Sequence, residues 1–260
     1  MDILDKFIES TRRNLKEGYY DIMPAETKLK HLSLVQTIKT KKFILITEIK
    51  HASPAGEYSF DEMNVEGSAT TFRESGADAI SVVVEPKIFK GRIGDVPLAK
   101  KAGLPVLFKD FIIDKRQITA ARNVGADAVL LIVKVTERIG LDLDDLIVFA
   151  HENKLEVLLE SYDVEEMKMA VKTDADMLGI NNRDLTTLKT DIRRTKEILD
   201  AVGKEKLGKP LISESGIRSA EDVAFVRNAG ASGVLVGTAI WKASSIREKI
   251  AELRRGAGNE

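Results

Sequence analysis

The strongest constraint on the fold is a short pattern that recurs along the chain. A helical segment ends, a Gly-Ala-Asp turn follows, and a buried apolar run begins; this occurs at 75–82 and at 124–131. Residues 229–236 repeat the pattern with Ser in place of Asp, and residues 173–180 carry a weaker copy. Glycine at a helix end, directly before an apolar run of strand length, is typical of a helix that leads into a buried strand. The repeated unit is therefore one helix–strand step.

Eight short apolar runs alternate with helical patterns after residue 43. We expect strands at 44–50, 77–84, 105–109, 126–133, 155–160, 176–180, 210–214 and 233–236. We expect helices at 61–75, 95–102, 115–123, 142–153, 164–171, 191–202, 219–229 and 239–254. Such alternation implies right-handed crossovers and a parallel sheet, and eight units match an α/β fold of the (β/α)8 TIM-barrel type. An open doubly wound sheet is the alternative, but it more often carries a Gly-rich loop after its first strand, and residues 48–54 are not one.

Residues 1–40 precede the first strand. They show helical spacing at 3–8 and a second helical pattern from about 26 to 38. A segment of this length cannot bury a core of its own. We therefore predict an N-terminal helical extension, residues 1–40, packed on a single barrel domain that comprises residues 1–260.

Composition excludes several classes of function. Lys and Arg number 40 against 41 Asp and Glu, whereas nucleic-acid and membrane-surface proteins usually have a basic excess. The absence of Cys excludes disulfides, thiolate zinc sites and cysteine nucleophiles, and the three histidines lack metal-ligand spacing. No apolar run approaches the roughly 20 residues needed to span a bilayer, and the N-terminus does not resemble a signal peptide. We expect a cytoplasmic protein that binds neither nucleic acid nor membrane.

Polar residues gather where the predicted strands end. Residues 44–50 place Ile44, Ile46, Glu48 and Lys50 on one face, which therefore changes from apolar to ionic. Other strands end in Lys109-Asp110, Glu160, Asn181-Asn182-Arg183-Asp184, Glu214-Ser215-Gly216 and Gly237-Thr238. Barrel enzymes carry their sites at the carboxyl ends of the strands, so this asymmetry favours a catalytic site over structural ion pairs at a solvent boundary.

The residue types indicate acid catalysis on a phosphorylated molecule. Two lysines and two or three glutamates suit the protonation of a carbonyl group, whereas metal hydrolysis would use His or clustered Asp. Ser215-Gly216 and Gly237-Thr238 stand before helices after the last two strands, where this fold commonly cradles phosphate; the alternative is that they are ordinary turn residues. Phe89 and Phe111 could hold an aromatic ring or simply close the barrel mouth.

The sequence favours no catalytic role for two other side chains. His51 could touch a substrate, but an imidazole in a loop is more commonly solvated. Trp241, in the last helix, is expected to pack in the core.

Seven blocks, in order, make the chain resemble the indole-3-glycerol phosphate synthase family. The blocks are residues 46–56 (Ile-Thr-Glu-Ile-Lys-His-Ala-Ser-Pro-Ala-Gly), 104–114 (Leu-Pro-Val-Leu-Phe-Lys-Asp-Phe-Ile-Ile-Asp), 125–132, 155–160 (Leu-Glu-Val-Leu-Leu-Glu), 179–185 (Gly-Ile-Asn-Asn-Arg-Asp-Leu), 213–217 and 236–238. The resemblance implies ring closure of 1-(2-carboxyphenylamino)-1-deoxyribulose 5-phosphate, with loss of CO2 and water, in tryptophan biosynthesis. It implies no metal and no organic cofactor, and we expect a monomer.

The resemblance also implies roles for particular residues. Lys109 matches the general acid on the ketone, Lys50 the lysine that binds the substrate carboxylate, and Glu160 the glutamate of the dehydration step. Glu48 is expected to support catalysis beside these three. The matches to the substrate-binding set are Asn181, Arg183, Glu214, Ser215, Phe89 and Phe111. The matches to the phosphate site are Ser53, Gly216, Gly237 and Thr238.

The chain departs from the family pattern at two places, and two other functions are weighed. His51-Ala52 stands where the family usually has Arg-Lys or a similar pair, and Ser161-Tyr162-Asp163 stands where it usually has Val-His-Asp. These departures lie beside the proposed acids and bases and could alter loop motion and turnover. Phosphoribosylanthranilate isomerase is one alternative, but that family resembles one that uses a Cys–Asp pair, and this chain has no Cys. The other is an inactive barrel that only binds a phosphorylated ligand or a partner.

Overall fold

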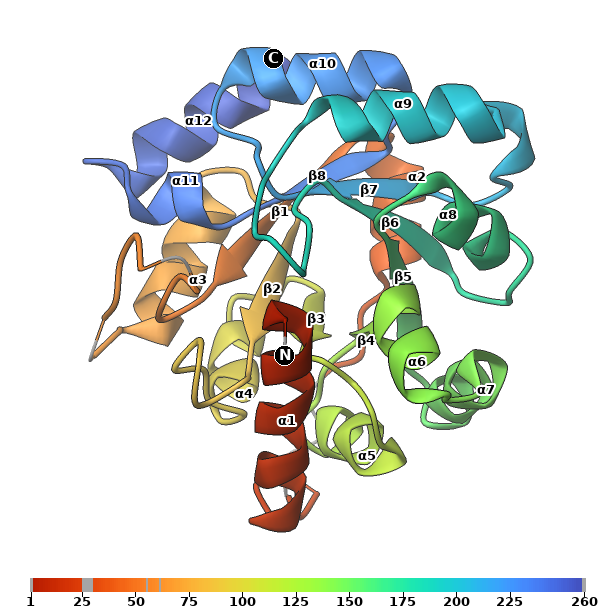
Figure 1. The fold of residues 1–260 in the computed structure, drawn as a ribbon. Coiled ribbons are helices and arrows are strands. Elements are labelled where there is room, and N and C mark those ends of the chain that lie inside the picture. The colour runs from red at the N-terminus through yellow and green to blue at the C-terminus, as the bar shows by residue number, and fades with distance from the viewer. Residues whose placement is uncertain (1, 25–29, 55, 61, 259–260) are drawn as a thin grey trace.

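The protein is a closed barrel of eight parallel strands in sequence order (Figure 1). The computed structural model describes residues 2–24, 30–54, 56–60 and 62–258. The strands are β1 (Ile44–Ile49), β2 (Ala79–Val83), β3 (Val106–Lys109), β4 (Ala128–Ile132), β5 (Glu156–Ser161), β6 (Met177–Asn181), β7 (Leu211–Glu214) and β8 (Gly233–Val236). The barrel closes where β1 pairs with β8, with Ile44 opposite Gly233. The predicted (β/α)8 barrel is confirmed, and the open-sheet alternative is wrong.

Helices surround the strands in the alternation that the sequence predicts. They are α3 (Val65–Glu74), α4 (Asp95–Lys100), α5 (Lys115–Asn123), α6 (Val133–Ile139), α7 (Leu143–Glu152), α8 (Val164–Ala170), α9 (Arg193–Val202), α10 (Ala220–Ala229), α11 (Thr238–Trp241) and α12 (Ile246–Gly256). Two differences matter. The apolar run 126–133 hides the boundary at which β4 passes directly into α6. The single helix expected at 239–254 is two helices, because Ser245 caps a new one by accepting a hydrogen bond from the Glu248 N–H (3.3 Å).

The Gly-Ala-Asp pattern has a physical role at the amino ends of the strands. Asp127 makes a two-way pair with the start of β3: its N–H donates to the Val106 carbonyl (2.9 Å), and its carboxylate accepts from the Val106 N–H (2.7 Å). Asp78 pairs in the same way with Leu45, Asp176 with Val157, and Ser232 with Leu211. Each even-numbered strand is thus tied to the odd-numbered strand before it.

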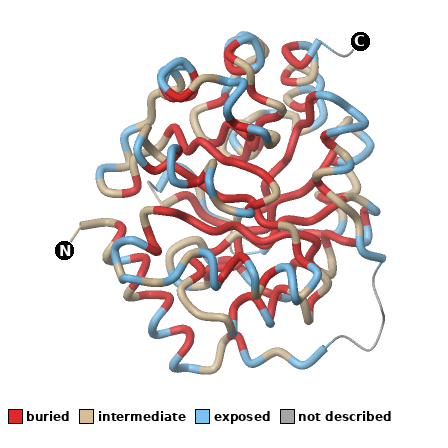
Figure 2. Tube along the Cα trace, turned by 90° about the vertical axis from the view of Figure 1, so that its right-hand side faces the viewer, coloured by how far each residue is buried: buried red, intermediate tan, exposed pale blue. Residues whose placement is uncertain are grey.

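The core has two layers, one inside the barrel and one between the strands and the outer helices. The inner layer contains Ile44 and Ile46 of β1, whereas Leu45 and Ile49 of the same strand face the helices, as a period of two requires. Figure 2 shows buried residues concentrated along the central strands and on the inward faces of the helices. At the carboxyl ends the inner face carries charged side chains, such as Glu48 and Lys109, that line a cavity.

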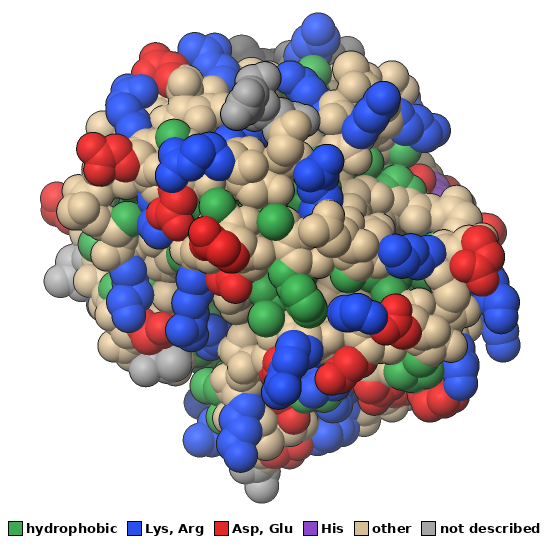
Figure 3. Space-filling model, turned by 90° about the horizontal axis from the view of Figure 1, so that it is seen from above, with side chains coloured by type: hydrophobic (Ala, Val, Ile, Leu, Met, Phe, Trp, Pro, Cys, Tyr) green, Lys and Arg blue, Asp and Glu red, His purple; other side chains and the backbone are tan. Residues whose placement is uncertain are grey.

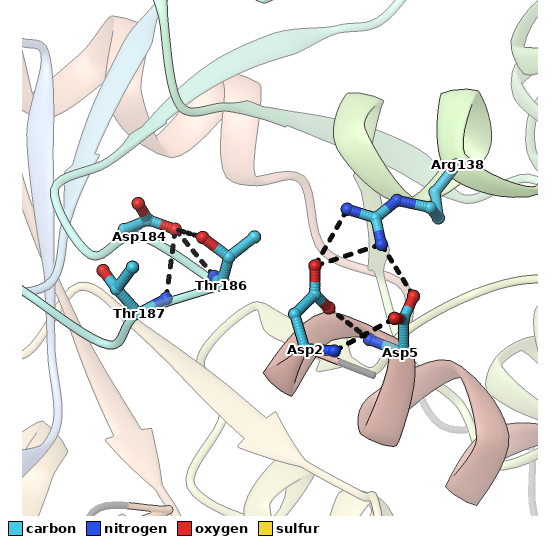
Figure 4. Close-up of polar contacts among 6 residues, drawn as sticks. All are labelled: Asp2, Asp5, Arg138, Asp184, Thr186 and Thr187. Carbon is cyan, nitrogen blue, oxygen red and sulfur yellow. Dashed lines mark hydrogen bonds and ion pairs between the residues drawn. The ribbon is translucent and has the colours of Figure 1, made fainter.

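Two helices precede β1, and they contact opposite ends of the barrel. Helix α2 (Leu34–Lys41) lies at the amino ends, where Glu156 of β5 accepts hydrogen bonds from the Leu34 and Val35 N–H groups (2.7 and 3.2 Å). Helix α1 (Ile3–Lys16) lies in front of the barrel in Figure 1, and its first turn is held by Arg138 of α6, which binds Asp2 and Asp5 (Figure 4).

The second predicted helix is therefore shorter than expected. It begins at Leu34, after the N-cap Ser33, and residues 30–33 are not helical; the predicted start at 26–29 lies outside the described residues.

Charges of both signs share the outer surface. On the face seen in Figure 3, Lys and Arg side chains are interspersed with Asp and Glu, as the near-zero net charge requires. Within the described ranges, no helix is both long and apolar enough to cross a membrane.

Candidate active site

A cavity of about 470 Å³ opens at the carboxyl ends of the strands. It is lined by every residue that the sequence assigned to the site except Ser53 and Glu214: Glu48, Lys50, Phe89, Lys109, Phe111, Glu160, Asn181, Arg183, Ser215, Gly216, Gly237 and Thr238. The two exceptions are neighbours of the lining, since Glu214 binds Lys109 and Ser53 precedes Pro54. The topology therefore brings the predicted residues of seven strand ends to one mouth.

Lys109 is the centre of an ion network in this cavity. Its Nζ lies 2.6 Å from Glu214 Oε2 on β7 and 3.6 Å from Glu48 Oε2 on β1. Glu48 also binds Lys50, with Oε1 at 2.6 Å from Nζ. The two lysines therefore share one carboxylate, although β1 and β3 are not neighbours in the barrel. Both glutamates are almost completely buried, so the pairs are shielded from solvent.

The network keeps Lys109 charged and ready to donate a proton. Burial alone would lower the pKa of Lys109, but the attraction of Glu214, Glu48 and Glu160 outweighs it and raises the pKa above its ordinary value. Burial would likewise raise the pKa of Glu48, but Lys50 and Lys109 hold that pKa below its usual range.

Glu160 behaves differently from Glu48. Burial, reinforced by the negative charge of Glu214, raises the pKa of Glu160 to about 8, against the attraction of Lys109. Asn181 on β6 orients the carboxyl group by donating from Nδ2 to Glu160 Oε1 (3.0 Å). Burial also raises the pKa of Glu214. Glu160 is therefore largely protonated at neutral pH and can serve as an acid.

Two glycines make room for these carboxylates. A Cβ atom at Gly179 of β6 would lie 2.8 Å from Glu214 Oε1, and one at Gly237 would lie 2.5 Å from Glu48 Oε1. Real Cβ atoms essentially never lie this close to another heavy atom outside their own residue and its neighbours. The sequence marked Gly237 for phosphate approach, but its nearest constraint is the carboxylate of Glu48.

The far side of the mouth, at β7 and β8, is suited to an anion. Ser215 and Gly216 follow β7 with φ values of +67° and +82°, and the Ser215 carbonyl accepts a hydrogen bond from Asn182 Nδ2 (3.0 Å), which fixes the turn. Arg183 and three cations that the sequence did not single out also line the cavity: Arg218, Lys242 and Lys249. Ser53, in contrast, is buried and donates to Glu57 Oε2 (2.9 Å).

An aromatic wall stands across the barrel, beyond β2 and β3. The ring centroids of Phe89 and Phe111 are 6.2 Å apart, and Phe7 of α1 contacts both, at 5.6 and 4.5 Å. Leu130 and Ile132 of β4 and Leu185 extend the apolar lining. Phe7 was missed because its position depends on where α1 packs, and no local pattern encodes that.

Two structural expectations have different outcomes. His51 is almost completely buried, with Nε2 at 2.7 Å from Asp95 Oδ2, so the expected solvated imidazole is wrong. Its backbone is held as well, since Phe60 N–H donates to the His51 carbonyl (2.8 Å). Trp241 packs against the outer core as expected and donates from Nε1 to the Glu48 carbonyl (2.7 Å).

The departure at 161–163 leaves the Glu160 side chain in the lining of the cavity. Ser161 is buried, and the ring of Tyr162 lies under the Arg194 guanidinium (4.0 Å). Among the described residues, no group of three His, Asp or Glu is placed to hold a metal ion.

Comparisons with known proteins agree on one family. The family model described as indole-3-glycerol phosphate synthase matches residues 7–253. Proteins of that name from Bacillus cereus and Bacillus mycoides are each 39% identical over 246 residues, covering 94% of this chain and 94% of their own.

Solved structures share the fold at lower identity. Thiamine phosphate pyrophosphorylase from Pyrococcus furiosus has a TM-score of 0.61 at 20% identity, covering 84% of this chain and 96% of its own. The N-acetylmannosamine-6-phosphate 2-epimerase from Clostridium perfringens also has a TM-score of 0.61, at 18% identity, with 90% and 99% covered. At such identities the likeness concerns the barrel alone.

Proposed function

The chain belongs to the indole-3-glycerol phosphate synthase family and is a carboxy-lyase of tryptophan biosynthesis, and we propose that the residues at the barrel mouth carry out its ring closure. The substrate is a phosphorylated small molecule, 1-(2-carboxyphenylamino)-1-deoxyribulose 5-phosphate. The observation that carries the residue assignment is the ion network of Glu48, Lys50, Lys109 and Glu214, which joins the ends of β1, β3 and β7 in the cavity that Glu160 of β5 also lines.

Lys109 is the acid of the first step. The aryl carbon that bears the carboxylate attacks the ketone carbon, and Lys109 donates a proton to the ketone oxygen, which becomes a hydroxyl group. The carbon–carboxylate bond then breaks, CO2 leaves, and its electron pair restores the aromatic ring. A charged ammonium held by Glu214 and Glu48 is suited to this donation, because it is protonated and fixed in direction.

Glu160 is the acid of the second step. It donates its proton to the new hydroxyl group, which leaves as water, while a proton is lost from the carbon beside the nitrogen and the indole forms. The raised pKa of about 8 supports this role. Lys50 holds the substrate carboxylate before it leaves, and Glu48 keeps both lysines in place.

The remaining residues bind the two ends of the substrate. Ser215, Gly216, Gly237 and Thr238 take the phosphate, with Ser53 supporting the loop nearby, and Asn181, Arg183 and Glu214 position the groups between the two ends. Phe89 and Phe111, together with Phe7, form the wall for the aryl ring. No metal or organic cofactor has a part in this scheme.

Turnover of the carboxyphenylamino sugar phosphate, followed by indole fluorescence, tests the function directly. Purified protein should form indole-3-glycerol phosphate, and Lys109→Met at equal concentration should not. A wild-type protein that binds the substrate but never forms the indole would favour the inactive barrel. A soak with inorganic phosphate tests the anion site: we expect it between 215–216 and 237–238, and a phosphate bound elsewhere, with that position empty, would refute the assignment.

We extend the proposal to the organisation of the chain. Residues 1–40 are an extension of one barrel domain, because α1 and α2 contact opposite ends of the same barrel. The cytoplasmic location and the monomeric state remain predictions from the sequence, and size-exclusion chromatography with light scattering would test the second.

A further inference from the structure

Two buried carboxylates beside the cavity, Glu85 and Asp110, have no part in the chemistry above. Glu85 follows β2 and is completely inaccessible to solvent, while Asp110 follows Lys109 and is 3% exposed. A buried carboxylate is costly unless hydrogen bonds satisfy it. The partners of each carboxylate therefore indicate what it is for.

Glu85 joins helix α1 to the loop that carries Phe89. Its Oε1 accepts hydrogen bonds from Ser10 Oγ (2.7 Å), Asn14 Nδ2 (3.4 Å) and the Lys87 N–H (3.1 Å). Its Oε2 accepts from the Ile88 and Phe89 N–H groups (2.6 and 3.0 Å). One side chain thus receives two donors from α1 and three from the loop after β2.

Asp110 makes the same kind of link for Phe111. Its Oδ1 accepts from the Phe111 N–H (2.9 Å), and its Oδ2 accepts from Tyr20 Oη (2.6 Å) and Gln117 Nε2 (3.1 Å). Tyr20 lies just beyond the end of α1. The amides of Phe89 and Phe111 therefore each lie on a buried carboxylate that is also bound by a side chain from residues 10–20.

We propose that Glu85 and Asp110 are positioning residues through which residues 10–20 set the place of Phe89 and Phe111 and so control binding of the aryl end of the substrate. The aryl ligand in this inference rests on the proposed function, but the hydrogen bonds that link residues 10–20 to Phe89 and Phe111 do not. The carbonyl of Phe89 also accepts from the Ala52 N–H (3.0 Å), so displacement of Phe89 would reach the loop that follows Lys50.

Glu85→Gln is the main test, and Glu156→Gln is its matched control. Glu156 also accepts hydrogen bonds from a serine hydroxyl (Ser33) and two backbone N–H groups of the N-terminal segment, but it lies at the opposite end of the barrel. In each glutamate both carboxylate oxygens accept hydrogen bonds. In Gln one of these oxygens is replaced by an NH2 group, which therefore faces donors whichever way the amide turns. Both variants should therefore lower the melting temperature, and only Glu85→Gln should affect the wall.

Three measurements on the full chain separate the outcomes. In Glu85→Gln, hydrogen–deuterium exchange of residues 86–91 should accelerate. KM should rise about tenfold or more, because hydrogen bonds to a carboxylate are lost, and kcat should change less than KM. The inhibition constant of inorganic phosphate, which binds across the barrel, should stay within about twofold of the wild-type value. Asp110→Asn should act in the same way on residues 110–113.

Ser10→Ala is a milder change, because it removes one hydrogen bond from α1 to Glu85 and leaves the donors of the loop intact. It should accelerate exchange at 86–91 and raise KM in the same direction by a smaller factor. Unchanged exchange and KM in Ser10→Ala would overturn the link to α1, as would a KM in Glu85→Gln no different from that in Glu156→Gln. A wild-type enzyme without turnover would instead refute the proposed function, while the exchange data would still test the link between α1 and residues 86–91.

Discussion

The acid role of Glu160 predicts that kcat falls as the pH rises through about 8. Glu160 must hold a proton to release water from the cyclised intermediate, and because this step follows the irreversible loss of CO2, it contributes to kcat and not to kcat/KM. With a pKa of about 8, roughly nine molecules in ten are protonated at pH 7 and roughly one in ten at pH 9. We therefore expect a decrease of about tenfold between these two pH values.

Few other groups can produce this inflection. The second ionisation of the substrate phosphate lies near pH 6 and its carboxylate ionises well below that. The pKa of Lys109 is raised above its ordinary value, so it stays charged throughout the range. A Glu160→Gln variant should show a much lower rate whose remaining pH dependence lacks the inflection near 8.

Two variants should shift the inflection in opposite directions. Asn181→Ala removes the hydrogen bond that stabilises the ionised carboxylate, so the inflection should move to higher pH. Glu214→Gln removes the neighbouring negative charge that opposes ionisation, so the inflection should move to lower pH. Opposite shifts are a stringent outcome, because general damage to the site would lower the rate without moving the two profiles apart.

The assay is kcat from pH 6 to 10, from indole fluorescence at saturating substrate concentrations. Ionic strength is held constant, since the ion network and the anionic substrate both respond to salt. A profile that is flat from 7 to 9, or an inflection near 8 that persists in Glu160→Gln, would refute the assignment of the acid.

The other predictions concern the lysine, a glycine and the amino end of the barrel. Lys109→Ala should lower kcat by about a hundredfold or more while substrate binding stays measurable by titration, and near-normal turnover would exclude the acid role. Gly237→Ala should push Glu48 away from Lys50, costing about 1–3 kcal/mol, and a crystal structure should show a displaced carboxylate. Asp127→Ala should destabilise the fold by about 3–5 kcal/mol, because it leaves buried Lys100 without its partner; calorimetry would measure this, and an unchanged melting temperature would contradict it.

The barrel could be predicted because its sequence signals are local and repeated. Buried parallel strands require continuous apolar runs, and each Gly-Ala-Asp turn marks the beginning of a strand. The same logic fails where one element passes into another without a break in hydrophobicity, as from Ile132 of β4 to Val133 of α6. Helix α2 begins later than its apolar spacing suggests. Its N-cap is Ser33, and its first backbone N–H groups donate to Glu156, a residue far away in sequence.

The site could be predicted only where topology alone decides position. Lys50, Lys109 and Glu160 meet because every strand delivers its last residue to the same end of a parallel barrel. Phe7 of α1 and Lys249 of α12 reach the cavity from helices whose placement depends on long-range packing, and Arg218 lies in the loop before α10, so the strand-end rule does not find them. The buried pair of His51 and Asp95 was missed for the same reason, since 44 positions separate the two partners.

Charge balance around Lys109 explains why one of three nearby carboxyl groups should hold a proton. Two lysines, Lys50 and Lys109, face Glu48, Glu160 and Glu214 in a space that is largely closed to water. Glu48 and Glu214 bind the ammonium groups at 2.6 Å, which leaves Glu160 without a close cation and beside the charge of Glu214. A third buried negative charge would be uncompensated, so Glu160 takes the proton. The same balance of charge around Lys109 thus supplies a protonated acid for the loss of water, and Lys109, held by two of the carboxylates, remains the donor to the ketone.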